Sequence, residues 1–486
     1  MASSTNARLP LMRVQPAPGD VLRIHPAARQ RLRLTGGALT IACGQRTARV
    51  TMKEDGRVSE ETLLVPETTL RALSLASPAA RGLRFRAKGR GSVLELGPVI
   101  GILAKVGPGR PPLARDHGYE LINAVWNVEN LGGLVYFFAP EHIDWRSRTV
   151  RGFVHVPGRL EWEQGEFPFP KAIYRRAIVK TDLLAKIKRS VTPNIFNPVG
   201  LGNKLVQYQL LHRDPGIRKH LPETLPLDSE ASFYQMLDRF GRVYVKNTQK
   251  GAGGGIFRVK KLPDGLRVRH RLRRGRILSD EETEVTVRGF EEFINLATRQ
   301  ARWPWTAKHW LVQRPVDIAR YNGNPFDIRI DVQKDGRGRW YIPGHIVRIA
   351  PTADHAVTRL GRCRSLRPVA EALWPGRAGE IVRRVDALAI AACRLLEHHL
   401  GLVGDVGVDI ALDQDGQPWF FEANPRPNHI YRTVDTLETE YWTKVFNPLV
   451  FAAHLAGFSL DAGDIARPKA RPVREVVRGG RCYARP

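Results

Sequence analysis

Two carboxylates and an amide, Asp409, Glu422 and Asn424, have the residue types and spacing of a metal site. They flank Asp415-Gly416, and Asp-Gly between two alternating apolar runs is a strong signal for a β-hairpin. With Asp415-Gly416 as a two-residue loop, the pairs expected across the hairpin are Leu412 with Trp419, Ile410 with Phe421 and Asp409 with Glu422. Because side chains alternate along a strand, Asn424 lies on the same face as Glu422. The spacing therefore predicts an oxygen-rich cluster on one face of a hairpin.

The clustered carboxylates need a counter-charge, because like charges directly opposite each other destabilise a pair of strands. Mg²⁺ binds one or two carboxylates and completes its shell with water and nucleotide phosphates, and Mn²⁺ accepts similar ligands. We therefore expect a Mg²⁺ site at Asp409, Glu422 and Asn424. We also expect that replacing both acids by amides stabilises the metal-free protein, since their repulsion is relieved. The alternative is a solvated turn with scattered acids, which is our interpretation of Asp413 and Asp415.

A glycine-rich loop is the second candidate. Lys246 ends an apolar run, and Lys250-Gly251-Ala252-Gly253-Gly254-Gly255 follows before the next apolar run starts. Glycines let backbone N–H groups approach a phosphate closely, and the two lysines supply positive charge. The loop lacks the GxxxxGK[ST] pattern, and a strand follows it where a dinucleotide-binding fold has a helix. A protein-kinase interpretation fails as well, because His212-Arg213-Asp214 precedes the loop and no DFG follows. The alternative is a flexible hairpin connection.

Two further segments carry residues suited to a nucleotide. Leu311 to Asp317 has the pattern of a short strand that runs into a linker, where Gln313, Arg314 and Val316 can offer backbone groups to adenine and Asp317 a carboxylate to ribose.

From Phe326 to Val332, apolar residues alternate with Asp327, Arg329 and Asp331, which is typical of a half-buried strand. Arg329, and Arg348 from the next strand, are candidates for binding a phosphate. In a chain rich in arginine, surface salt bridges are the alternative for both.

The elements that position these residues follow from periodicity. Residues 1–95 contain short β-like runs typical of a small sheet or barrel. Two continuous apolar runs, Pro98 to Ala104 and Gly133 to Phe138, enclose a short helical segment and predict a βαβ unit with a parallel sheet. Further on, helices are expected from Lys204 to His212, from Ser229 to Phe240 and from Ile381 to Leu400, the last closed by Gly401.

The composition narrows the class of protein. A formal net charge of +28 favours polyanionic ligands. However, the arginines are spread along the chain, and the dense clusters at 267–276 and 467–485 lack interleaved aromatic residues. No run approaches the roughly 18 apolar residues of a membrane span, and residues 1–20 lack the apolar core of a signal peptide. We therefore expect a cytoplasmic protein whose four widely spaced cysteines are reduced, and we do not expect nucleic-acid binding.

The order of these motifs resembles the ATP-grasp fold, in which a nucleotide lies between two α+β subdomains under a glycine-rich flap. More narrowly, the segment from about Leu96 to Phe451 resembles the YheC/YheD-type ATP-grasp proteins, described as endospore coat-associated. The motifs that carry the closer resemblance are Gly97-Pro98-Val99-Ile100-Gly101-Ile102-Leu103, Leu221-Pro222-Glu223-Thr224, Phe326-Asp327-Ile328-Arg329 and Phe421-Glu422-Ala423-Asn424. The implied organisation is an N-terminal β-rich domain (1–95), a small α/β domain (96–200), the ATP-grasp domain (201–450) and a basic tail (451–486).

The resemblance also implies roles for individual residues. Lys204 and Lys246 would contact the α- and β-phosphates, residues 250–255 would cover them, and 313–316 would hold adenine. Asp317 would bind ribose, Arg329 and Arg348 the γ-phosphate, and Asp409, Glu422 and Asn424 two Mg²⁺ ions. One departure is Gly407, since the D-alanine–D-alanine ligases, which share the fold, have an arginine two residues before the metal-binding aspartate. For that reason the acyl acceptor and the stabilisation of its oxyanion do not carry over.

The activity implied by the resemblance is an ATP-dependent carboxylate–amine ligase that acts through an acyl-phosphate and releases ADP, with ATP and unidentified carboxylate and amine substrates as ligands. A second hypothesis is a non-catalytic protein of a spore coat or surface layer, with coat components as partners, that retains ATP binding. A third is a polyanion-binding protein that uses the basic excess, with steep salt dependence and no need for Mg²⁺.

Overall fold

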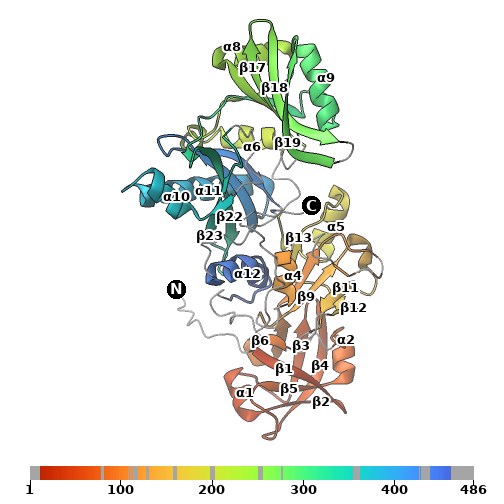
Figure 1. Cartoon of the computed structure of the whole chain (residues 1–486). Coiled ribbons are helices and arrows are strands. Elements are labelled where there is room, and N and C mark those ends of the chain that lie inside the picture. The colour runs from red at the N-terminus through yellow and green to blue at the C-terminus, as the bar shows by residue number, and fades with distance from the viewer. Residues whose placement is uncertain are drawn as a thin grey trace.

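The computed structural model divides the chain into units arranged along a long axis, with the N-terminal unit at one end (Figure 1). The described residues are 11–77, 82–107, 109, 111–112, 119–126, 131–156, 161–197, 203–249, 255–274, 277–353, 362–425, 427 and 438–460.

The N-terminal unit is a closed β-barrel with strand order β1-β5-β2-β4-β3-β7-β6. Its strands are β1 (Leu11–Ala17), β2 (Val21–Ile24), β3 (Ala38–Cys43), β4 (Arg46–Glu54), β5 (Thr62–Pro66), β6 (Gly82–Lys88) and β7 (Val93–Gly97), with two short helices, α1 (Pro26–Arg31) and α2 (Glu67–Ala72). The small sheet or barrel expected for residues 1–95 is thus a barrel, in which β1 and β5 pair in parallel with each other. Parallel partners far apart in sequence leave no turn signal between them.

The second unit is a mixed sheet of order β10-β11-β9-β8-β13-β14, with β12 paired to β11. Its elements are β8 (Val99–Leu103), α4 (Tyr119–Trp126), β9 (Leu134–Phe138), β10 (Ile143–Asp144), β11 (Thr149–His155), β12 (Trp162–Pro168), β13 (Ala172–Arg175), α5 (Thr181–Ser190) and β14 (Ile195–Phe196). Strands β8 and β9 are parallel and fully buried, so the predicted βαβ unit is confirmed. The antiparallel strands β11 and β12 were not predicted.

The third unit is an antiparallel sheet at the far end of the molecule, with order β15-β20-β16-β17-β18-β19 (Figure 1). Its elements are β15 (Thr224–Pro226), α8 (Glu230–Phe240), β16 (Arg242–Asn247), β17 (Ile256–Leu262), β18 (Gly265–Arg274), β19 (Ile277–Val287), α9 (Phe290–Ala301) and β20 (Trp310–Gln313). Residues of α8 and α9, such as Phe233 and Phe293, share one apolar core with Val245 and Phe257. The helices therefore cover one face of the sheet, and Lys246 lies on the opposite face.

The fourth unit carries the acidic residues, on a sheet of order β24-β23-β22-β25-β26 to which β21 adds through β22. Its elements are β21 (Arg320–Tyr321), β22 (Asn324–Lys334), β23 (Trp340–Ile349), β24 (Arg362–Arg364), α10 (Leu366–Leu373), α11 (Ala378–Leu400), β25 (Asp405–Leu412) and β26 (Pro418–Asn424). Helices α10 and α11 pack on the face that bears Ile328, Ile330 and Ile410. Asp327, Arg329 and Asp409 therefore lie on the other face.

Three more helices join these units. Helices α6 (Lys204–Leu211) and α7 (Pro215–Arg218) precede β15, and α12 (Glu438–Leu455) packs between the second and fourth units. Phe446 and Val450 of α12 share a core with Ile100 and Tyr174 of the second unit. Residues 451–455, placed in the tail by the sequence, form the last turn of α12.

The dense basic cluster at 267–276 is partly paired and partly buried. Arg267 and Arg269 lie within β18 and pair with Glu284 at 3.4 Å and Glu282 at 3.6 Å across the ladder, and Arg271 is buried. Arg276 and the tail at 467–485 lie outside the described residues.

The prediction of reduced thiols is wrong for Cys363, which is disulfide-bonded, whereas Cys43 and Cys393 are free and buried. Among the helices described, none has the length and apolar character needed to cross a membrane.

Candidate functional site

The acidic hairpin pairs Asp409 with Glu422 as predicted, but its loop and the register next to the loop differ from the prediction. Its loop runs over Asp413–Gln417, not over two residues, and the side chain of Asp413 accepts hydrogen bonds from the backbone N–H groups of Asp415 and Gln417. A β-bulge between Asp409 and Ile410 then restores the register.

The pairs next to the loop consequently differ from the predicted ones: Ile410 faces Phe420 instead of Phe421, and Leu412 faces Pro418 instead of Trp419. The one-residue offset at the loop and the extra residue at the bulge cancel each other. For that reason the pairing of the two acids survives.

The two carboxylates meet positive side chains from three other elements. Arg329 of β22 lies directly opposite Asp409 and donates two hydrogen bonds to it, Nε to Oδ1 at 2.6 Å and Nη2 to Oδ2 at 3.0 Å. Arg348 of β23 donates to Asp409 Oδ1 at 3.0 Å and to both oxygens of Asp327, at 2.7 and 2.6 Å. Lys204 lies 2.7 Å from Glu422 Oε2. The protein's own cations therefore neutralise the acid pair.

Burial and these cations compete in setting the protonation of the acids. Burial raises the pKa of the Asp409 carboxyl, against the effect of Arg329 and Arg348. Burial acts in the same sense on Glu422, but Lys204 and the 3.1 Å hydrogen bond from Asn424 outweigh it and hold the Glu422 pKa well below its usual range. The three hydrogen bonds from guanidinium groups stabilise the charged form of Asp409 at neutral pH.

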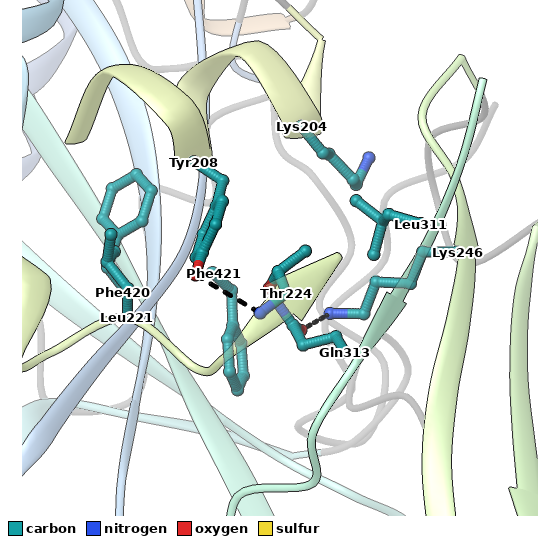
Figure 2. Close-up of a pocket in the computed structure, with 9 residues that line it drawn as sticks. All are labelled: Lys204, Tyr208, Leu221, Thr224, Lys246, Leu311, Gln313, Phe420 and Phe421. Carbon is teal, nitrogen blue, oxygen red and sulfur yellow. Dashed lines mark hydrogen bonds between the residues drawn. The ribbon is translucent and has the colours of Figure 1, made fainter. Parts of the chain in front are cut away.

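The position of Lys204 follows from the start of its helix. The side chain of Asn203 caps α6 by accepting hydrogen bonds from the N–H groups of Leu205 and Val206, both at 3.0 Å. Lys204 is thereby fixed as the first residue of the helix, where it points toward the cleft between the two sheets (Figure 2).

Gly407 departs from the ligase pattern, and the structure shows what takes the space above it. A Cβ at this position would lie 2.9 Å from Nη1 of Arg329 and 2.8 Å from Cβ of Pro427. The side chain of Arg329 lies over Gly407, and from there its guanidinium bonds to Asp409. A side chain at position 407 would displace that guanidinium.

The cleft between the two sheets contains a small cavity next to the acid pair (Figure 2). Its volume is about 10 Å³, and it is lined by Lys204, Tyr208, Leu221, Thr224, Lys246, Leu311, Gln313, Phe420 and Phe421. Lys246 Nζ donates to Gln313 Oε1 at 2.6 Å, and Gln313 Nε2 donates to Thr224 Oγ1 at 2.8 Å. This space holds about one water molecule, so the cavity by itself does not admit a purine.

Lys246 has an altered protonation equilibrium. Burial lowers its pKa from 10.5 to about 8, because the opposing attraction of Glu422 only partly offsets the desolvation of the ammonium group.

A wider groove of about 590 Å³ adjoins the cavity and shares Tyr208, Leu221 and Thr224 with it.

The other predicted nucleotide-binding residues that the structure describes do not line the small cavity. Arg314 stacks over Trp419 with its guanidinium carbon 4.5 Å from the ring centroid, whereas Asp317 is exposed on the linker after β20. Val316 is half-buried, and Gly255 is buried with its carbonyl accepting from Asn247 N–H at 2.8 Å. Lys250, Gly251, Gly253 and Gly254 lie outside the described residues.

Sequence reasoning missed Tyr208, which lines the cavity, and it named Thr224 and Phe421 only as parts of motifs. Neither Tyr208 nor Thr224 carries a chemical pattern of its own. The motif at 221–224 was the one available signal, since it follows the helices that begin at Lys204 and borders the same cleft.

The oxygen donors fit Mg²⁺ in their chemistry. Asp409, Glu422 and Asn424 offer two carboxylates and an amide oxygen within one hairpin, which suits a hard divalent cation. No group of three or more His, Cys, Asp or Glu residues suited to a metal occurs in the described part of the chain. Lys204, Lys246, Arg329 and Arg348 offer matching positive charge for phosphates.

Comparison with known proteins places these features in a family. A family model described as YheC/D-like ATP-grasp matches residues 193–455, more than half of the chain. Two curated relatives from Bacillus subtilis (strain 168) are also similar. The endospore coat-associated protein YheD is 26% identical over 381 residues, which cover 76% of this chain and 80% of the relative. The endospore coat-associated protein YheC is 20% identical over 307 residues, which cover 60% and 79%.

Among solved structures, D-alanyl-alanine synthetase A from Vibrio cholerae is similar at 14% identity and a TM-score of 0.42, covering 74% of this chain and 97% of that chain. We draw no inference from a likeness at that TM-score.

The ion pairs generate a prediction about stability that reverses the one from the sequence. Asp409→Asn should destabilise the ligand-free protein by about 3 kcal/mol, because it leaves Arg329 and Arg348 in a buried site without their shared partner. Chemical denaturation monitored by circular dichroism measures this change. Glu371→Gln, at an exposed helical salt bridge with Arg367, is the control and should shift stability by less than about 1 kcal/mol. Equal or greater stability of Asp409→Asn would show that repulsion between the acids dominates.

Proposed function

We propose, from the premise that the chain belongs to the YheC/D-like ATP-grasp family, that it uses Mg²⁺ and ATP to join a carboxylate to an amine. Members of this family have the ATP-grasp fold, which the sequence had predicted for this chain. The single observation that carries the proposal is an acid pair bonded by three cations, Lys204, Arg329 and Arg348. A fourth cation, Lys246, lines the same cleft.

The residues take roles according to their charge and place. Lys204 and Lys246 would bind the α- and β-phosphates, and Arg329 and Arg348 the γ-phosphate. Residues 313–316 would hold adenine through backbone groups, Asp317 would meet the ribose, and the glycine loop at 250–255 would close over the phosphates. Asp327 keeps Arg348 in position through its two hydrogen bonds.

The metal would be held by Asp409, Glu422 and Asn424. When bound, Mg²⁺, and Mn²⁺ in its place, supplies positive charge that offsets the negative charge of the phosphates. The family resemblance implies two such ions. With the carboxylates occupied in this way, Arg329 and Lys204 would be available to the phosphates without leaving an unpaired charge in the cleft.

The reaction then needs no side-chain nucleophile. A substrate carboxylate oxygen attacks the γ-phosphorus, the bond to the bridging oxygen breaks, and ADP leaves. The amine nitrogen attacks the acyl-phosphate carbon, inorganic phosphate leaves, and the amine proton passes to phosphate or solvent. Arg329 and Arg348 stabilise charge on the transferred group, as electrostatic catalysis of phosphoryl transfer requires.

A second candidate function is a structural role that retains ATP binding. The observation that favours it is that both curated relatives are named endospore coat-associated proteins. In that case the protein would associate with coat components if its organism sporulates, whereas the ligase would act in the cytoplasm. A nucleic-acid-binding role has less support, because Arg267 and Arg269 already pair with glutamates.

Product analysis tests the ligase. ADP and phosphate should appear only when Mg·ATP, a carboxylate and an amine are all present, and hydroxylamine in place of the amine should trap a hydroxamate. Arg329→Ala should lower kcat by about 100-fold and raise the KM for ATP much less, since its charge matters most during transfer. Arg339→Ala, at an exposed pair with Asp335, is the matched control.

AMP and pyrophosphate as products would contradict the mechanism. Tight Mg·ATP binding without turnover of any carboxylate would favour the structural role instead.

The pKa of Lys246 predicts how nucleotide affinity changes with pH. The lysine is charged below about pH 8 and neutral above it, and a phosphate binds the charged form. Mg·ATP affinity measured by calorimetry should therefore fall as pH rises above 8, by up to about tenfold per pH unit, with proton uptake on binding. Lys246→Arg keeps its charge throughout this range and should give a flat profile. The same slope in both proteins would refute the assignment to Lys246.

A further inference from the structure

The segment that bears Glu422 and Asn424 has little support from its own sheet. Strand β26 is the last strand of its sheet, so among the strands that the structure describes none pairs with the outer side of its backbone. Past the bulge only three residue pairs remain, and the last one, Gly407 with Asn424, ends the strand. A short edge segment between a bulge and a strand end is expected to fray. Two side-chain amides from other elements hold this segment.

Gln207 of α6 occupies the open edge. It is 4% exposed, and it pairs with the backbone of Ala423 in both directions: Nε2 donates to the Ala423 carbonyl at 2.8 Å, and Oε1 accepts from the Ala423 N–H at 2.8 Å. The amide thus takes the place of a neighbouring strand at the residue between Glu422 and Asn424. Its helix also carries Lys204, which pairs with Glu422.

Asn197 closes the open end of the hairpin from the second unit. It directly follows β14 and is 1% exposed. Its Nδ2 donates to the carbonyls of Asp405, at 2.7 Å, and Pro425, at 2.9 Å. Its Oδ1 accepts from the N–H groups of Gly404, at 3.0 Å, and Asp405, at 3.1 Å.

One side chain thereby ties the start of β25 to the residue after Asn424. Asn197 has a φ of 61°, a left-handed conformation that asparagine tolerates better than most residues, so backbone and side chain together suit this position.

We propose that Asn197 and Gln207 are positioning residues that hold Glu422 and Asn424 in the geometry that binds the metal. Neither amide lies among the proposed metal or phosphate ligands; each acts through the backbone on either side of Asn424. Because Asn197 lies in the second unit, that unit helps to position the proposed metal ligands on the fourth unit. This inference rests on the proposed function.

The test compares two asparagines three residues apart. Asn194 also donates from Nδ2 to two backbone carbonyls, of Lys171 at 3.1 Å and Leu455 at 2.9 Å, but neither belongs to the acidic hairpin. Asn197→Asp and Asn194→Asp each remove the same donor group. In both cases the added negative charge would by itself attract a cation, so weaker metal binding must come from lost position.

The measurement is Mn²⁺ affinity in the presence of ATP, from the electron paramagnetic resonance signal of free Mn²⁺. Asn197→Asp should weaken Mn²⁺ binding by about tenfold or more, as is typical when a partner of a metal ligand is removed, and Asn194→Asp should leave it unchanged. ATP affinity measured with EDTA should stay the same in both, which separates a metal effect from general unfolding. Gln207→Glu, which keeps the acceptor and loses the donor to Ala423, should behave as Asn197→Asp does and covers the case in which that variant does not fold.

Equal Mn²⁺ affinity in Asn197→Asp, Gln207→Glu and the control would overturn the inference. If the unaltered protein fails to bind Mn²⁺ with ATP, the proposed function fails first, so the two failures are distinguishable.

Discussion

The ion pairs between two acids and three cations are the interaction on which the site depends. Asp409, which is buried, and Glu422, which is half-buried, face each other across a hairpin, and two carboxylates so placed could not both ionise without compensation. Arg329 and Lys204 provide most of it, at 2.6 and 2.7 Å. Arg329 reaches Asp409 because Gly407 has no side chain, and Lys204 stands where it does because Asn203 starts its helix there. Gly407 and Asn203 therefore both serve the neutralisation of the acid pair.

That requirement has a consequence for ligand binding. A triphosphate that took the cations away would leave two carboxylates facing each other. A metal that took the carboxylates would leave Arg329 without its carboxylate partner, whereas Arg348 would keep Asp327. Either step alone costs the desolvation of an unpaired charge. When metal and triphosphate arrive together, each charge exchanges one partner for another, so the two ligands should bind with strong positive coupling. The small cavity fits this picture, since Lys246 bonds there to the neutral side chain of Gln313 and not to one of the acids.

The parts of the fold that the sequence predicted are those with local signals. Alternation and Asp-Gly located the acidic hairpin, continuous apolar runs located the parallel strands β8 and β9, and Gly401 marked the end of α11. The predicted hairpin register was right at Asp409 and wrong at Ile410, because neither a five-residue loop nor a compensating bulge has a signature in this sequence. Contacts made across the chain were out of reach: nothing near Asn197 or Gln207 indicates that their amides meet a hairpin more than 200 residues away.

The most direct test of this account is a calorimetric comparison of Mg²⁺ alone, ATP with EDTA, and Mg²⁺ added to the protein with ATP present, after correction for the Mg·ATP complex in solution. The account predicts that Mg²⁺ alone binds weakly, since it would have to displace Arg329 and Lys204 without giving them a new partner. ATP should then raise the affinity of the protein for Mg²⁺ by about 100-fold, a coupling within the usual range between two linked sites. Mg²⁺ binding of equal strength with and without ATP would contradict the claim that these carboxylates exchange protein cations for the metal.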